Sequence, residues 1–120
     1  MGKDQIMSDC LFCKIVDKKI PSKLVHEDDK TVAFEDINPQ APVHILVVPK
    51  RHVQSVSELN AADAGLLGHL MLTGAAIAKQ KGVAESGYRL VVNTGRNGGQ
   101  TVFHLHLHLL GGRPMHWPPG

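Results

Sequence analysis

The sequence predicts an α+β domain with a mainly antiparallel five-stranded sheet, one long helix and one short helix. Short apolar and β-branched runs, bounded by turn residues, indicate strands in the first half of the chain and again near its end. A single long segment between them carries apolar residues at the spacing of a helix. Strands first, then one long helix, then two final strands are the order expected of this class.

The N-terminal part divides into a polar segment and a short helix. Residues 1–9 are polar and are expected to be disordered, so the single domain is expected to span residues 10–120. A short helix with one apolar face is predicted to follow, and Pro21 is predicted to end it. The apolar positions of this helix are Leu11, Phe12, Ile15 and Val16.

A hairpin and a loop come next. Residues 23–27 and 31–34 hold apolar residues on either side of the polar turn 28–30, which predicts two paired strands. Residues 36–42 contain two X-Pro pairs and are therefore predicted to form a loop.

The centre of the chain predicts a strand followed by the long helix. Residues 43–48 form a β-branched run typical of a central strand, and Pro49 stops it because proline cannot donate to the ladder. Residues 61–81 are predicted to be helical, with Gly82 in the left-handed conformation just after the end. The apolar positions of the helix include Leu66, Leu67, Leu70, Met71, Ala75, Ile77 and Ala78.

The last third of the chain is predicted to complete the sheet. Residues 88–93 and 102–110 are interpreted as two strands, separated by the glycine-rich turn 95–99. Residues 111–120 then form a C-terminal tail. No internal repeat and no linker divides the chain.

Composition and charge narrow the classes of partner. The net charge of +2 comes from scattered pairs of cations, without a basic block or an aromatic platform for bases, so no nucleic-acid polymer is expected as a partner. Neither a transmembrane span nor a secretory signal is predicted. We therefore expect a cytoplasmic protein that does not bind membranes, with a nuclear location also open in a eukaryote.

The most informative motif is a row of alternating histidines. In a strand, His104, His106 and His108 would share one face and the leucines between them the other, because successive side chains point to opposite faces. Neighbouring imidazoles would stand about 6.5 Å apart along an accessible groove. A neutral imidazole can attack phosphorus, and its neighbours can donate to phosphoryl oxygens or to the departing group. From spacing alone, a polar strand face or a surface that captures metal explains the row equally well.

The residues just before this row add a second observation. The run Gly98-Gly99-Gln100-Thr101 brings backbone amides and a hydroxyl close to the histidines, and amides in a glycine turn can hold phosphate oxygens. Taken alone, such a turn is more often only a hairpin connection. Together, the row and the turn favour a site for a phosphate-containing substrate.

The run His104-Leu-His106-Leu-His108-Leu-Leu110 resembles the signature of the histidine triad superfamily. The resemblance covers nearly everything after residue 9, and the tail 111–120 is similar to that of the histidine triad nucleotide-binding (Hint) branch. Further matching segments are residues 12–15, 20–21, 34–37, 39–42, 49–52 and 91–93, with His44. The resemblance implies hydrolysis of purine nucleoside phosphoramidates, in which adenosine or guanosine monophosphate is linked to an amine, without a catalytic metal. It also implies a homodimer in which the long helices and one strand of each chain form a continuous sheet.

The resemblance also implies roles for individual residues. His106 would be the nucleophile that forms a nucleotidyl-histidine intermediate, with His108 and Thr101 contacting the phosphate or the leaving amine. His44 would support the catalytic imidazole row, which includes His104. The positions implied to bind the nucleotide, besides Thr101, His106 and His108, are Phe12, Ile15, Phe34, Asp36, Ile37, Asn93, Gly99 and Gln100, with the Asp36 carboxylate accepting hydrogen bonds from the ribose hydroxyls. Without the resemblance, ordinary core packing would explain the four apolar positions better.

The two cysteines, Cys10 and Cys13, leave three interpretations open. Their spacing suits half of a tetrahedral zinc site, half of a redox pair, or no function. Some members of the superfamily hold zinc between such a pair and two histidines, and the matching positions here are His52 and His104. A structural zinc that takes no part in catalysis is the resulting hypothesis.

Two alternative functions stay open. One is a nucleotide-binding scaffold or regulatory protein whose partner surface matters more than its chemistry, and the other is hydrolysis of dinucleoside polyphosphates. The transferase branch carries Gln where this chain has His108, which favours water as the final acceptor. The tail is implied to border the site of the other chain in the dimer, so Trp117 is either that border or an apolar anchor for the terminus.

Overall fold

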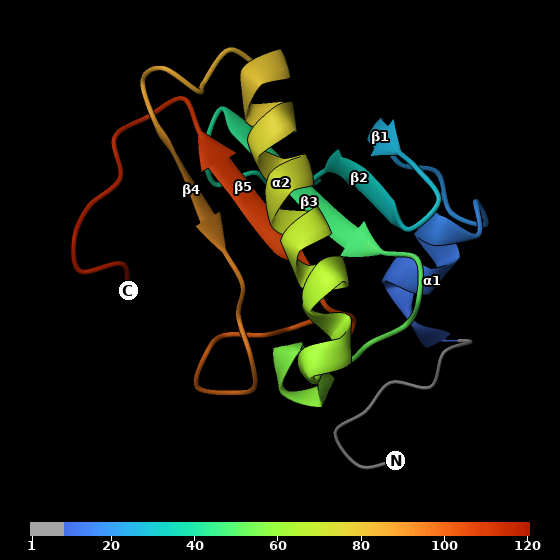
Figure 1. Ribbon diagram of the computed structural model, residues 1–120. Helices are drawn as coiled ribbons and strands as arrows, with labels where there is room; N and C mark the ends of the chain where they lie inside the picture. Colours follow the sequence, from blue (N-terminus) through green and yellow to red (C-terminus); the bar gives the residue numbers. More distant parts are fainter. Residues whose placement is uncertain (1–8) are drawn as a thin grey trace.

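The computed structural model describes residues 9–120, so the disorder expected for residues 1–9 falls almost entirely outside the described residues. Figure 1 shows a sheet with the long helix across one face. The elements in chain order are α1 (Leu11–Val16), β1 (Leu24–Glu27), β2 (Thr31–Glu35), β3 (Val43–Pro49), the 3₁₀ turns η2 (Val56–Glu58) and η3 (Ala61–Asp63), α2 (Ala64–Gln80), β4 (Tyr88–Val91) and β5 (Leu107–Gly111).

The sheet has five strands in the order β1-β2-β3-β5-β4, and each neighbouring pair is antiparallel. The central strand β3 pairs with β2 on one side and with β5 on the other, from Val43 opposite Gly111 to Val47 opposite Leu107. This architecture confirms the predicted α+β class and its antiparallel sheet. The outer strands β1 and β4 leave two open edges.

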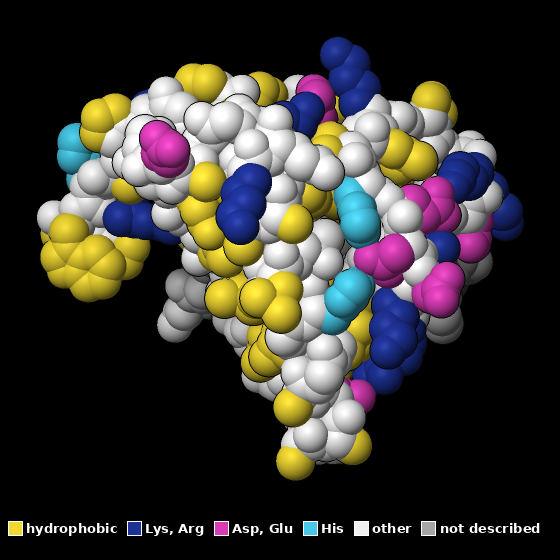
Figure 2. Space-filling model, turned by 45° about the horizontal axis from the view of Figure 1, so that its top comes forward, with side chains coloured by type: hydrophobic (Ala, Val, Ile, Leu, Met, Phe, Trp, Pro, Cys, Tyr) yellow, Lys and Arg dark blue, Asp and Glu magenta, His cyan; other side chains and the backbone are white. Residues whose placement is uncertain are grey.

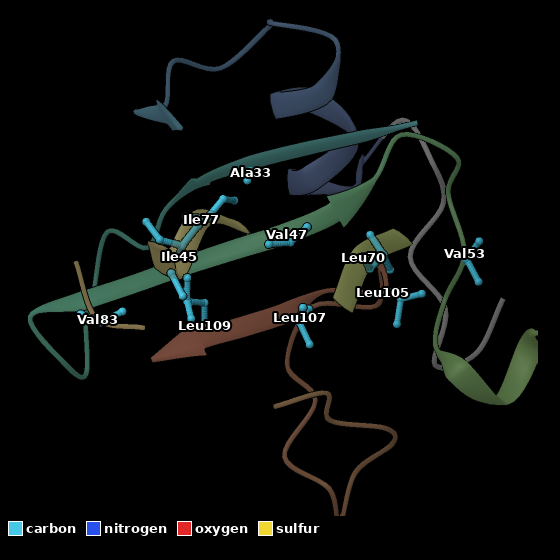
Figure 3. Close-up of a cluster of buried hydrophobic side chains, with 11 residues drawn as sticks. Ala33, Ile45, Val47, Val53, Leu70, Ile77, Val83, Leu105, Leu107 and Leu109 are labelled. Carbon is cyan, nitrogen blue, oxygen red and sulfur yellow. The ribbon is translucent and has the colours of Figure 1, made fainter. Parts of the chain in front are cut away.

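One face of the sheet packs against α2. Alternate residues of β3 and β5 point toward the helix, so they are buried together with its inner side. Gly74 lets the helix approach closely, since a Cβ there would lie 3.0 Å from Cδ2 of Leu107. The residues labelled in Figure 3 that form this core are Ala33, Ile45, Val47, Val53, Leu70, Ile77, Val83, Leu105, Leu107 and Leu109. Burying one such leucine stabilises the fold by roughly 1.5–3 kcal/mol.

The opposite face carries a second, smaller core under α1. The buried members of this cluster are Cys10, Phe12, Ile15, Val32, Phe34, Leu46 and Val48. The helix begins where Sγ of Cys10 accepts a hydrogen bond from the amide of Cys13 at 3.4 Å. It ends at Val16, earlier than the predicted stop at Pro21, because the chain already turns at Lys18, whose φ is 64°. Of the four predicted apolar positions, Phe12 and Ile15 are buried, whereas Leu11 is exposed.

The last strand is shorter than predicted. Residues 102–110 were expected to form it, whereas β5 begins only at Leu107. The residues before Leu107 do not pair with β3. Instead, the amide of Leu105 donates to the carbonyl of Val53 at 2.6 Å, and Nε2 of His104 donates to the carbonyl of Pro49 at 2.8 Å. The alternation nevertheless persists, because Leu105 packs in the α2 core with Leu107.

The long helix follows the prediction closely, with Gly82 at φ 76° just after its end. By length and composition, Ala61–Gln80 is also apolar enough to cross a membrane, with a mean hydropathy of 1.3. No transmembrane span was expected from the sequence. One side of the helix packs on the sheet, while Met71 and Leu72 on its outer side are exposed.

Candidate active site

A cavity of about 580 Å³ lies on the α1 side of the sheet, and most of the predicted site residues line it. It is bounded by α1, by the loop after β2 and by the histidines at the start of β5. The predicted site residues that line it are Phe12, Ile15, Phe34, Asp36, Ile37, His44, Thr101, His106 and His108. The volume is within the usual range for a small-molecule site. Residues separated by almost a hundred positions in sequence thus meet around one cavity.

His106 is oriented by the backbone of His104. Its Nδ1 lies 2.7 Å from the carbonyl oxygen of His104, and since a carbonyl can only accept, Nδ1 carries the hydrogen. The lone pair is therefore on Nε2. The ring of Phe12 stands edge-on against the imidazole, with the ring centres 5.1 Å apart. Burial lowers the pKa of His106, against the opposing effect of this hydrogen bond, so the imidazole is neutral at neutral pH.

A chain of hydrogen bonds fixes the hydrogen positions of His44 and His108. The amide of Gln40 donates to Nδ1 of His44 at 3.0 Å, so Nε2 of His44 must carry the hydrogen of the neutral ring. This Nε2 lies 3.0 Å from Nδ1 of His108 and donates to it. The hydrogen of His108 is then on its Nε2. Burial, with further contributions from the imidazoles of His106 and His44, lowers the pKa of His108 to about 4.

The same geometry decides whether these residues could bind a metal. One ligand atom each from Asp36, His44 and His108 lies within 4.8 Å of the others, which is close enough for shared coordination. Coordination would need a lone pair on Nε2 of His44, but that atom carries the hydrogen because Nδ1 already accepts from Gln40. The group is therefore a hydrogen-bonded relay and does not fit a metal ion.

Asp36 lies at the edge of the cavity with unused acceptor capacity. Its Oδ1 accepts from the amide of Asn38 at 2.8 Å, and its Oδ2 is 3.4 Å from Nε2 of His44. A carboxylate has about four lone-pair directions, so two hydroxyl donors can still be accommodated. The neighbouring Ile37 is 96% exposed, whereas Phe34 on the cavity wall is buried. The cavity thus combines apolar walls with one carboxylate.

Four of the residues predicted for catalysis or nucleotide binding lie in the described part of the chain but do not line this cavity. Asn93 and the exposed Gly99 lie outside its lining, and His104 is buried behind it. The side chain of Gln100 is held by backbone groups, including the carbonyl of Gln54 at 2.7 Å, and its amide donates to the carbonyl of Gly95 at 3.1 Å, so neither is free for a ligand. The expectation that all three histidines form one accessible row was therefore wrong for His104, which is buried, while His106 and His108 line the cavity.

The spacing within the row also differs from the prediction. The ring centres of His106 and His108 are 4.9 Å apart, less than the predicted spacing of a regular strand. Only His108 lies in β5, because the chain before Leu107 is irregular. The backbone groups of Gln40 and Pro49 that orient His44 and His104 were not predicted from the sequence. A main-chain donor or acceptor leaves no signal in a residue pattern.

Cys10, Cys13, His52 and His104 form a second cluster behind the cavity. One ligand atom of each lies within 4.8 Å of all the others. Nδ1 of His52 is 3.2 Å from Sγ of Cys13, and Nδ1 of His104 is 3.4 Å from Sγ of Cys10. Bonds of about 2.3 Å to sulfur and 2.0–2.1 Å to nitrogen make the edges of a zinc tetrahedron about 3.5 Å. The four atoms therefore have nearly the separation that zinc requires.

The hydrogen positions in this cluster also fit a metal. Nε2 of His104 donates to the carbonyl of Pro49, which leaves the lone pair of Nδ1 pointing at the thiols. Both cysteines are free rather than joined in a disulfide. Without a cation, burial and the neighbouring Cys10 raise the pKa of Cys13 to about 12. A divalent ion would supply the charge that stabilises the thiolates.

A second hollow of about 570 Å³ lies between the β1–β2 hairpin and the start of α2. Two of the cations that line it are already paired, Lys50 with Glu27 at 3.1 Å and Arg51 with Asp63 at 3.2 Å. It contains none of the triad histidines. The cavity beside His106 is therefore the better candidate, although the two are similar in size.

An open antiparallel sheet that carries three alternating histidines beside an apolar cavity defines a protein of the histidine triad type. Residues 17–115 match the model of the HIT domain, and the chain belongs to this family. It is 50% identical over 105 residues to the purine nucleoside phosphoramidase of Escherichia coli K12, covering 88% of each chain. An uncharacterized HIT-like protein of Synechococcus elongatus is 57% identical over 93% of this chain and 97% of its own length.

Solved structures show the same likeness. The HIT family hydrolase from Legionella pneumophila matches with a TM-score of 0.91 and 49% identity, over 93% of this chain and all of that chain. At this identity the likeness extends to sequence as well as fold. The family expected from the histidine row is thereby confirmed.

Proposed function

We propose that the protein hydrolyses purine nucleoside phosphoramidates, with His106 as the nucleophile. The observation that carries this proposal is the 2.7 Å hydrogen bond from Nδ1 of His106 to the carbonyl of His104. This bond keeps the hydrogen on Nδ1, so the neutral ring has its lone pair on Nε2, where it is available to a ligand. A ring held in one tautomer loses little freedom on reaching the transition state. The 50% identity to a protein named purine nucleoside phosphoramidase supports the substrate class.

The cavity suggests how a nucleotide would lie. The purine would contact the apolar wall made by Phe12, Phe34 and Ile37, all of which line the cavity. The ribose hydroxyls would donate to the carboxylate of Asp36, which has acceptor positions to spare. The phosphate would then lie near His106, whose imidazole lines the cavity together with those of His44 and His108. This arrangement places phosphorus rather than the base at the nucleophile.

The reaction would proceed in two displacements on phosphorus. In the first, Nε2 of His106 forms a bond to phosphorus while the P–N bond breaks, and the amine leaves with a proton taken from solvent. The resulting imidazolium keeps its Nδ1 hydrogen bond to the carbonyl of His104, which disperses its positive charge. In the second, water attacks phosphorus, Nε2 departs as a neutral imidazole, and one proton returns to solvent. One water is consumed overall.

His108 would act as a fixed hydrogen-bond donor in this reaction. Because its Nδ1 accepts from His44, its Nε2–H is the group available to a phosphoryl oxygen. The lowered pKa keeps the ring neutral in the free site. Removing one such donor from a preorganised site typically lowers kcat by roughly 10²–10³-fold. The hydroxyl of Thr101, which also lines the cavity, would provide a second contact to the phosphate or the amine.

We also propose that the Cys10, Cys13, His52 and His104 cluster holds a structural zinc ion. A bound zinc would cross-link α1 to the segments that follow β3 and precede β5. Its positive charge would stabilise the thiolates, and it would take no part in the displacement at phosphorus. Reduced thiols are expected in the cytoplasm, which remains the proposed location.

The outer side of α2 supports the proposal of a homodimer. Figure 2 shows hydrophobic side chains gathered on this face of the molecule, and Met71 and Leu72 are 43% and 72% exposed. The helix also presents small residues outward, including Ala64 and Gly68, which would allow close approach of a second helix. Strand β4 is an open edge of the sheet, so pairing with its copy would continue the sheet across the dimer.

The decisive experiment locates the covalent intermediate. A nucleoside phosphoramidate is mixed with the protein, quenched rapidly without acid, and analysed by peptide mass spectrometry. We expect the nucleotide on His106, and no adduct in the His106→Ala variant, whose turnover should fall by roughly 10⁴-fold or more while its fold is kept. An adduct on another side chain would contradict the proposal.

The same assay separates the alternative functions. Specificity constants for an amine-linked and a phosphate-linked adenylate distinguish phosphoramidate hydrolysis from hydrolysis of dinucleoside polyphosphates. We expect the amine-linked substrate to be preferred. A biological effect that survives His106→Ala would instead favour the scaffold role.

A further inference from the structure

We propose that Arg113 is a positioning residue for the triad, acting through the loop 36–42 on His44 and, through His44, on His108. This inference rests on the proposed function. Arg113 lies just after β5, at the start of the C-terminal tail, and does not line the cavity. Its effect on the site would therefore be indirect.

The loop that controls His44 holds itself together by local bonds. The amide of Asn38 donates to Oδ1 of Asp36 at 2.8 Å, and Nε2 of Gln40 donates to the carbonyl of Asn38 at 3.0 Å. These bonds keep the shape of the loop but do not fix it against the rest of the chain. The amide of Asp36 is attached to β3 through the carbonyl of His44, at 3.0 Å. This attachment holds the beginning of the loop only.

The second half of the loop is held by the start of the tail. Nε of Arg113 donates to the carbonyl oxygen of Gln40 at 3.0 Å, so the residue whose amide bonds His44 is anchored at its other end. Gly112 packs directly against Pro42, and a Cβ there would lie 2.9 Å from Cβ of the proline. Its φ of 91° turns the chain so that Arg113 faces the loop. Two adjacent contacts therefore clamp the loop to the end of β5.

The position of Gln40 decides which nitrogen of His108 carries its hydrogen. While the amide of Gln40 donates to Nδ1 of His44, the hydrogen of His44 must be on Nε2, and His108 must accept at Nδ1. If the amide moves away, Nδ1 of His44 is free to take the hydrogen. Nε2 of His44 then becomes an acceptor, His108 donates to it from Nδ1, and no N–H of His108 points into the cavity. Arg113 thus maintains the hydrogen-bond donor that the substrate would meet.

The test replaces Arg113 with methionine, which keeps the length of the side chain and removes the guanidinium. We expect kcat for a nucleoside phosphoramidate to fall roughly 10-fold while KM changes by less than about 2-fold, since only a fraction of the molecules would keep the His108 donor to the transition state and the base and ribose contacts would remain. In a His108→Ala background the same substitution should change kcat by less than about 2-fold, because the residue through which it acts is absent. Equal effects in both backgrounds would overturn the proposal.

Arg89 provides a matched control. It also donates from its guanidinium to a main-chain carbonyl of the tail, that of His116 at 2.9 Å, but it does not contact the loop. The ring ¹⁵N shifts of His44 should move from one fixed tautomer to a mixture in Arg113→Met and stay unchanged in Arg89→Met. Unchanged His44 shifts in Arg113→Met would refute the inference. This measurement needs no turnover, so it tests the inference independently of the proposed hydrolysis. Failure of the proposed hydrolysis would show as an absence of turnover in the wild-type protein.

Discussion

The Nε2–H of His104 donates to the carbonyl oxygen of Pro49 at 2.8 Å, at the last residue of β3. This bond leaves Nδ1 of the same ring facing the thiol of Cys10, while the main-chain carbonyl of His104 orients His106. The fully buried His104 therefore belongs to the cysteine cluster through its side chain and to the histidine row through its backbone. Disruption of the cluster should therefore also displace His106.

The cysteines should be required for bound zinc. Protein prepared without chelators should contain about one zinc per chain, and Cys10→Ser with Cys13→Ser should remove it, since the thiolates supply half of the ligands. The melting temperature should fall with it, because binding to the folded state stabilises that state. Elemental analysis and thermal unfolding provide the measurements. His116→Asn, which changes an exposed histidine outside the cluster, should alter neither, and zinc-free wild-type protein would end the hypothesis.

Stability should decline as the pH falls from about 6.5 toward 4. The pKa of His108 is about 4 in the folded protein and 6.5 unperturbed, so below pH 6.5 the unfolded chain takes up a proton that the folded chain does not. The contribution of this group is complete above 6.5, and about 2 kcal/mol of it should be lost by pH 5. Urea unfolding at pH 7 and pH 5 measures the difference. His108→Gln should show a smaller loss, and an equal loss would contradict the assignment.

The outer side of α2 should be the dimer contact. Leu72→Glu places a charge where two apolar helices would meet, so the dimer should dissociate at micromolar concentration. Light scattering after size-exclusion chromatography measures the mass. Leu24→Glu is the matched control, because Leu24 is 42% exposed on β1 at the opposite edge of the sheet. A wild-type protein of monomer mass would show the proposal of a dimer to be wrong.

Removal of the tail after Arg113 should change substrate preference more than stability. The removed residues are mostly exposed, with Trp117 at 83%, so little buried area is lost. If the tail borders the partner's site, the ratio of kcat/KM for a bulky and a small leaving amine should change several-fold, with the melting temperature nearly constant. Trp117→Ala tests whether the indole alone accounts for the change. An unchanged ratio would favour the role of an apolar anchor.

The fold could be predicted because the spacing of its apolar side chains indicates which elements form and which faces are buried. Leucines at 105, 107 and 109 alternate with the histidines, and the structure buries every one of them under α2. The apolar face of α1 was equally clear, since Phe12 and Ile15 stand one helical turn apart and both are buried. The periodicity of apolar residues indicates which side chains are buried, and this is sufficient to predict how the helices and the sheet of this domain are layered.

The boundaries and the relay could not be predicted in the same way. The last strand begins five residues after its predicted start because the amide of Leu105 bonds to Val53, a contact between main-chain atoms distant in sequence. The tautomer of His44 likewise depends on the amide of Gln40, which every residue except proline would supply. Such contacts depend on the path of the chain rather than on residue type. The sequence could therefore indicate which side chains meet, but not how their hydrogens are distributed.

The alternation of leucine and histidine near the end of the sheet has a consequence for how this segment can vary. The leucines are fixed in register by the buried core, and the same register fixes where the imidazoles point. Deleting or inserting one residue between His104 and His108 would turn part of the segment over, so that imidazoles would enter the apolar core and leucines would face the cavity. Individual side chains here can be exchanged, but the length of the segment cannot change by one.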